Sequence, residues 1–200
     1  MREDKQQKLD RVAKSILSIV ARFGFESLTP SRLARATGVS RPWVYKYIGG
    51  SKEELSSFAI DHFGKLFTQL DGATKPTSVE FFQDDEIKRT EKTLAFAIEN
   101  PEIIQIYFRF KGTPTVMGKA IEKIEREYRK HKEFQIQETF KIGKTEAKVY
   151  TDILKSFKMS LCHQLISGST TAYSYEEFGK TGKDIFEIFF SELLNKNKKK

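Results

Sequence analysis

Apolar residues recur at intervals of three and four positions along most of the chain, a spacing that predicts an all-α protein. The first amphipathic segment ends at Gly24, which can adopt the positive φ of a helix C-cap. Its apolar stripe, which we expect to be core, comprises Leu9, Val12, Ala13, Ile16, Ile19, Val20 and Phe23. Farther along, proline and glycine separate helices expected at about 52–71, 77–99, 102–111, 115–142, 146–173 and 184–195.

Two short helices joined by a tight turn are predicted directly after the first helix. Thr29 can cap the earlier one, which has Pro30 at its first position, and Gly38 can end it. Ser40 can cap the later one, and Gly49 with the glycine after it breaks that helix. This layout is that of a helix-turn-helix DNA reader.

The outer face of the later short helix carries cations and aromatic side chains and no acid. It consists of Arg41, Trp43, Lys46 and Tyr47, with Tyr45 at its margin. Arginine and lysine reach phosphates or guanine edges, and tyrosine hydroxyls bond phosphate oxygens. We therefore expect this helix to enter the major groove, with the earlier one lying across the DNA backbone.

The segment from about Leu9 to Leu55 resembles the DNA-binding domain of the TetR (tetracycline repressor) family of bacterial transcriptional regulators. The resemblance rests on Phe23-Gly24-Phe25, Leu28-Thr29, Leu33-Ala34, Gly38-Val39-Ser40-Arg41, Val44-Tyr45 and Lys52-Glu53-Glu54-Leu55. It implies an N-terminal three-helix helix-turn-helix DNA-binding domain over residues 1–52. It also implies a C-terminal helical domain for ligand binding and dimerisation over residues 53–200.

The same resemblance implies that Thr29 and Lys52 contact DNA phosphates and that Tyr45 and Tyr47 contact the DNA backbone. The residues expected at the DNA are Thr29, Arg32, Ser40, Arg41, Pro42, Trp43, Tyr45, Lys46, Tyr47 and Lys52. Trp43 departs from the small polar residue usual in the family. Two alternatives stay open for it: contact with a thymine methyl or sugar, or a ring folded back on the domain.

The net charge of +8 is concentrated at the predicted reader. Residues 1–52 hold eleven Lys or Arg against four acids, and residues 196–200 hold four lysines, read as a solvated tail or as a nonspecific DNA contact. The N-terminus lacks a signal-peptide pattern, and no apolar run approaches the roughly 18 residues of a membrane span. We expect a cytoplasmic protein with no membrane partner.

Aromatic residues in the second domain predict a helical bundle that leaves room for a small-molecule effector. The candidate ligand-binding residues are Phe81, Phe96, Tyr107, Phe108, Phe110, Phe157, Leu161 and His163, taken from inward faces of the middle helices. His163 also suits a hydrogen-bonded structural role, and Cys162 suits a small buried hydrophobe better than a redox sensor. Scattered histidines and a single thiol predict no metal site, and no cofactor is expected.

The last two long helices carry apolar residues on more than one face, so one face can serve the core and another a second subunit. Proteins of the resembled family pair these helices in a homodimer, which implies a palindromic DNA operator. We expect a dimeric ligand-responsive regulator, a repressor released from its operator by an apolar or amphipathic effector. The alternatives are a constitutive DNA-binding dimer without effector and a helical enzyme acting on an apolar substrate. The enzyme lacks a recognisable constellation of nucleophile and base.

Overall fold

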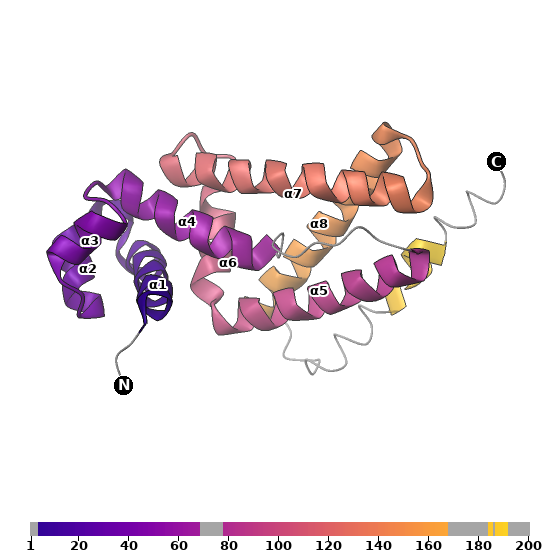
Figure 1. The fold of residues 1–200 in the computed structure, drawn as a ribbon. Helices are drawn as coiled ribbons and strands as arrows, with labels where there is room; N and C mark the ends of the chain where they lie inside the picture. Colours follow the sequence, from indigo (N-terminus) through magenta and orange to yellow (C-terminus); the bar gives the residue numbers. More distant parts are fainter. Residues whose placement is uncertain (1–3, 69–77, 168–183, 186, 192–200) are drawn as a thin grey trace. The chain divides into compact units, whose positions relative to one another are not determined.

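The structure, a computed structural model, describes residues 4–68, 78–167, 184–185 and 187–191, and these form helices and their connections, with no strand among them. The helices are α1 (Lys5–Phe23), a 3-10 turn η1 (Phe25–Ser27), α2 (Pro30–Thr37), α3 (Arg41–Tyr47), α4 (Lys52–Thr68), α5 (Val79–Glu99), α6 (Pro101–Phe110), α7 (Val116–Phe140) and α8 (Lys144–Ile166), drawn in Figure 1. Residues 184–185 and 187–191 are also helical. The predicted all-α class is confirmed.

Most helix boundaries fall within a few residues of the predicted ones. The largest difference is in α8, which ends at Ile166, because the backbone past that residue turns at Ser167. The remainder of the helix predicted over 146–173 lies outside the described residues. So do parts of the helices predicted over 52–71, 77–99 and 184–195, and the lysine-rich end at 196–200.

Two compact units divide the chain. Unit 1 comprises Met1–Thr68 and Pro101–Glu125, and unit 2 comprises Gln69–Asn100 and Arg126–Lys200. Helix α7 thus contributes residues 116–125 to unit 1 and residues 126–140 to unit 2. The functional boundary expected after residue 52 stays a prediction.

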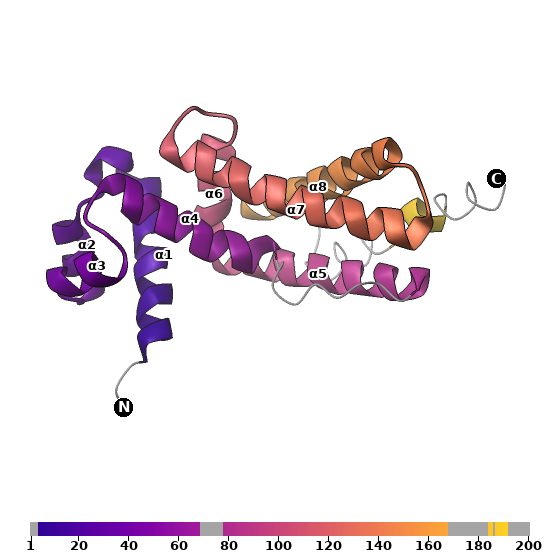
Figure 2. The same cartoon turned by 45° about the horizontal axis from the view of Figure 1, so that its top comes forward.

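Unit 1 is organised around α1, which packs against α2, α4 and α6. Asp4 caps α1 in a reciprocal capping box with Gln7, and Gly24 ends the helix at φ 82°. The buried face contains Val12, Ala13, Ile16, Leu17, Ile19 and Val20. Helices α2 and α3 lie side by side in both ribbon views (Figure 1, Figure 2).

Phe23 does not belong to that core, so this part of the predicted stripe is wrong. Its side chain is 57% exposed, and its ring lies 4.0 Å from the guanidinium carbon of Arg32. The ring sits on the last residue of α1, where the chain turns away from the core at Gly24. A cation–π contact therefore replaces burial for this side chain.

Unit 2 consists of α5, the second part of α7, α8 and the helical residues near position 190, and α5 packs on α8. Its apolar core is built around three aromatic rings. Phe82 meets Phe140 and Phe190 edge-on, with centroids 5.4 and 5.5 Å away, and those two rings stack at 5.8 Å. Offset and edge-to-face rings are the preferred aromatic arrangements, so this cluster joins three separate segments of the chain.

Candidate nucleic-acid interface

The two short helices begin at the predicted capping residues. The Arg32 amide donates to Thr29 Oγ1 (3.1 Å) at the start of α2, and the Trp43 amide donates to Ser40 Oγ (3.3 Å) at the start of α3. Gly38 ends α2 in the left-handed conformation at φ 72°. The predicted helix-turn-helix geometry, with Leu33 and Val44 buried beneath it, is therefore confirmed.

The face of α3 predicted to meet DNA is turned to solvent. Arg41, Pro42, Lys46, Tyr45 and Tyr47 are exposed, whereas Val44 is completely buried. Thr29 and Ser40 are exposed as well, and Arg32 is half-buried. The structure thus gathers the candidate DNA-binding residues of α2 and α3 within one small part of unit 1.

Trp43 is half-buried and lies along its own helix. Its ring centroid is 5.0 Å from that of Tyr47, and the ammonium of Lys46 lies 5.2 Å from the Tyr47 ring. The ammonium of Lys5 lies 4.6 Å from the same ring, which brings the start of α1 next to α3. Sequence spacing alone does not show which lysine or arginine on the polar side of α1 reaches α3.

A pair of glycines fixes the exit from α3. A Cβ at Gly50 would lie 2.5 Å from Tyr45 Cε1, so the Tyr45 ring lies directly on the glycine. Gly49 has φ 137°, a conformation that L-residues rarely adopt. Glu54 then closes the turn, because its carboxylate accepts from the amides of Gly50 and Ser51, both at 2.9 Å. The hydrogen bonds from Ser51 and Gly50 lower the pKa of Glu54.

Lys52, expected at a phosphate, forms an ion pair with Glu26 of the η1 turn. The Glu26 side chain is largely exposed, whereas that of Lys52 is about a third exposed. Glu26 was not singled out from the sequence, since it lies 26 positions away from Lys52. A carboxylate therefore pairs with the ammonium that the family resemblance assigns to a DNA phosphate.

The candidate ligand-binding residues are divided between the two units. Tyr107, Phe108 and Phe110 belong to unit 1, and Phe81, Phe96, Phe157, Leu161 and His163 belong to unit 2. The expectation that all lie on inward faces is wrong for Phe81, Phe108 and His163, which are exposed. Their helices bury other positions instead, among them Phe82, which follows Phe81, and Ile106, two positions before Phe108.

The remaining candidates are more enclosed. Leu161 is buried, and Phe157 packs against the aromatic cluster of unit 2. Phe96 and Phe110 are half-buried, and the half-buried Tyr107 donates its hydroxyl to Glu125. A role in ligand binding stays a prediction for each of the eight.

The described part of the chain brings no group of three His, Cys, Asp or Glu side chains together as metal ligands. Cys162 is buried, and burial raises the pKa of its thiol to about 12. Every described helix is too short or too polar to be a bilayer-crossing segment.

The arrangement of unit 1 is that of a helix-turn-helix protein, and comparison with solved structures identifies the fold of the whole chain. A Pseudomonas aeruginosa protein assigned as a transcriptional regulator matches with a TM-score of 0.69 at 16% identity, over 97% of this chain and 93% of its own. A TetR-like transcriptional regulator from a Rhodococcus species matches with a TM-score of 0.63 at 14% identity, over 95% and 99%. The fatty acid degradation regulator FadR from Bacillus halodurans matches with a TM-score of 0.60 at 13% identity, over 94% and 97%.

The chain therefore has the fold of TetR-family transcriptional regulators. No protein-family model matches its sequence, and no curated protein does. The expected resemblance is thus confirmed through structure.

Proposed function

We propose that this protein is a dimeric, ligand-responsive DNA-binding regulator, a repressor that leaves a palindromic operator when a small effector binds. The observation that carries the proposal is the exposed, acid-free face of α3, held by capped helices above a buried Leu33 and Val44. Several solved proteins of the same fold are described as transcriptional regulators, and the name of one of them, from Bacillus halodurans, connects it with fatty acid degradation.

The DNA-binding part is tested by selecting genomic fragments at moderate salt and measuring the affinity of the selected site. Lys46→Ala should weaken binding, and its slope against salt should fall by about one unit because one phosphate contact is lost. Lys119→Ala is the matched control, since this exposed lysine belongs to α7 in the same unit. Equal affinities of the two variants, or no preference over random competitor DNA, would refute the assigned face.

The dimer is supported by apolar side chains that unit 2 leaves exposed on α8 and near position 188. These are Val149, Ile153, Ile185 and Ile188. Buried in a two-fold interface, they would provide the apolar centre that obligate dimers require. We expect Ile153→Glu and Ile188→Glu to give monomers in sedimentation equilibrium, whereas Ile98→Glu, a comparably exposed isoleucine on α5, stays dimeric. A wild-type monomer would contradict this assembly.

A further inference from the structure

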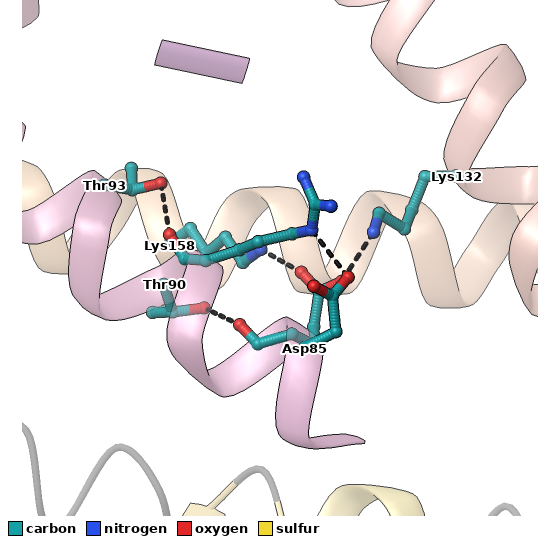
Figure 3. Close-up of polar contacts among 7 residues, drawn as sticks. Asp85, Thr90, Thr93, Lys132 and Lys158 are labelled. Carbon is teal, nitrogen blue, oxygen red and sulfur yellow. Dashed lines mark hydrogen bonds and ion pairs between the residues drawn. The ribbon is translucent and has the colours of Figure 1, made fainter. Parts of the chain in front are cut away.

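Unit 2 buries three charged side chains from three different helices. Glu86 of α5, Lys132 of α7 and Lys158 of α8 are only 1%, 4% and 8% exposed. Lys132 Nζ lies 2.5 Å from Glu86 Oε2, and Lys158 Nζ bonds the other carboxylate oxygen. Figure 3 shows Lys132 and Lys158 converging on this part of α5 from two directions, beside Asp85. We refer to Glu86, Lys132 and Lys158 as the buried triad.

The triad is not neutral, because two ammonium groups share one carboxylate. The neighbouring Arg89 pairs with Asp85 at 2.6 Å, and this pair adds no net charge. Although burial opposes ionisation, Lys132 and Lys158 lower the pKa of Glu86 to about 2, so its charge persists at neutral pH. Within the described residues the triad therefore carries one uncompensated positive charge, which is costly in a low-dielectric interior.

Hydroxyl groups without partners lie on the same helices. Tyr128 precedes Lys132 by one helical turn, and Thr151 lies two turns before Lys158. Their side-chain oxygens are buried and have no hydrogen-bond partner among the described residues. Burial and the nearby Glu86 carboxylate raise the pKa of Tyr128, so its hydroxyl remains a donor. Buried polar atoms of this kind are rare and call for a physical explanation.

Apolar surface adjoins the triad on one side. The ammonium of Lys132 lies 5.3 Å from the ring of Phe82, which belongs to the aromatic cluster with Phe140 and Phe190. A ligand with a negatively charged group at the two lysines would therefore have apolar side chains beside the rest of the molecule. This combination of cationic, hydroxyl and aromatic groups suits an acid with an apolar part.

We propose that the buried triad together with Tyr128 is the site at which unit 2 binds the carboxylate of an apolar organic acid. The carboxylate joins Glu86 between Lys132 and Lys158, which balances the charge, and it accepts a hydrogen bond from Tyr128. The inference rests on the proposed function, because it names the chemical class of the effector. It makes the effector an anion, and not a neutral apolar compound.

The first experiment compares straight-chain carboxylates of increasing length with the alcohols of equal length, using calorimetry on the full chain. At least one carboxylate should bind about tenfold or more tightly than its alcohol, because a hydrogen-bonded charge contributes more than a neutral group. Carboxylates and alcohols that bind equally, or a complete lack of binding across the series, would overturn the proposal.

Two variants separate ligand binding from a purely structural triad. Tyr128→Phe removes a hydroxyl that bonds nothing in the described protein, so folding should hardly change while carboxylate affinity falls about tenfold. Lys158→Met leaves the neutral pair of Glu86 and Lys132, and it should abolish the preference for carboxylate over alcohol. The control is Lys148→Met, an exposed lysine on the same helix, which should bind like the wild type. Unchanged affinity in both test variants would assign the triad to structure alone.

The same titrations on operator-bound protein distinguish failure of this site from failure of the proposed function. Linkage requires an effector that weakens DNA binding to bind more weakly to the complex. Carboxylate binding without any effect on DNA would support the site and overturn ligand-responsive regulation. Specific DNA binding by a protein that ignores every carboxylate would overturn the site and leave DNA binding intact.

Discussion

The two units place their cations in opposite environments. In unit 1, Arg41 and Lys46 stand in solvent on α3, where a charge keeps its hydration and is available to a polyanion. In unit 2, Lys132 and Lys158 are buried around a single carboxylate. An exposed cation costs little stability, whereas a buried one is tolerated only with a partner. The difference supports the two proposals made above, that unit 1 binds a polyanion at its surface and that unit 2 binds a carboxylate in its interior.

The largest expected effect comes from removing the carboxylate that pairs with both buried cations in the described part of the chain. Glu86→Gln leaves both ammonium groups without a carboxylate and should lower the free energy of unfolding by about 3–5 kcal/mol. Hydrogen exchange of α5, α7 and α8 measures the loss within unit 2. Trp43, the only tryptophan, reports on unit 1 by its fluorescence.

Asp84→Asn provides the control, because this exposed acid on the same helix should change stability by less than about 0.5 kcal/mol. Comparable stability of the two variants would mean that burial makes no difference to these charges. The contrast between the units would then fail.

Lowering the pH should reduce the difference in the free energy of unfolding between the wild type and Glu86→Gln. The folded-state pKa of Glu86, about 2, lies below its ordinary value of 4.5. Its stabilising contribution is therefore fully present above pH 4.5 and is lost as the pH falls towards 2. Urea unfolding of both proteins at pH 7, 5 and 3 measures this contribution. A stability difference that stays constant down to pH 3 would contradict the burial of Glu86 as a charged partner of the two lysines.

Sequence reasoning succeeded for unit 1 because its signals are local. The caps Thr29 and Ser40 and the positive φ of Gly38 each depend on the residues nearby, and all three were predictable. Exposure of Phe23 was not, because a stripe at helical spacing does not show where the core ends. The similarity to solved structures covers almost the whole chain, including the parts in which the sequence contains no recognisable motif.

The buried triad escaped prediction because its members lie 46 and 72 positions from Glu86. Lysine and glutamate are usually solvated, so composition gives no warning of burial. One signal was present on α5. Glu86 and Thr90 continue the spacing set by the buried Phe82 and Leu94, which places a carboxylate within an apolar stripe. The expected ligand residues are mostly aromatic and include no lysine or glutamate, so that prediction missed this polar interior.

A smaller effect concerns the turn that holds α3 in place. Gly49→Ala would put a Cβ 2.6 Å from that of Glu54 at φ 137°, and this strain should cost about 1–3 kcal/mol. Denaturation followed by Trp43 fluorescence measures the loss in unit 1. Gly143→Ala is the control, because Gly143 has φ −68° and open space around it. Alanine is a weaker N-cap than glycine but also restricts the unfolded chain, and these opposing effects should leave a change in stability below about 0.5 kcal/mol. Equal effects would show that the α3–α4 turn is not constrained by its glycine.

The smallest effect tests whether the exposed charges of unit 1 are available to DNA. Glu26→Gln frees Lys52 from its ion pair and should strengthen DNA binding about two- to fivefold at low salt, the range expected of an exposed pair. Glu122→Gln removes an exposed acid of α7 in the same unit, so it controls for the change in net charge. Affinity measured by fluorescence anisotropy at two salt concentrations should show the larger gain for Glu26→Gln, and higher salt should reduce it. If both variants gain equally, Lys52 is attracted to DNA only through the overall charge of unit 1, and Glu26 does not compete with a phosphate for it.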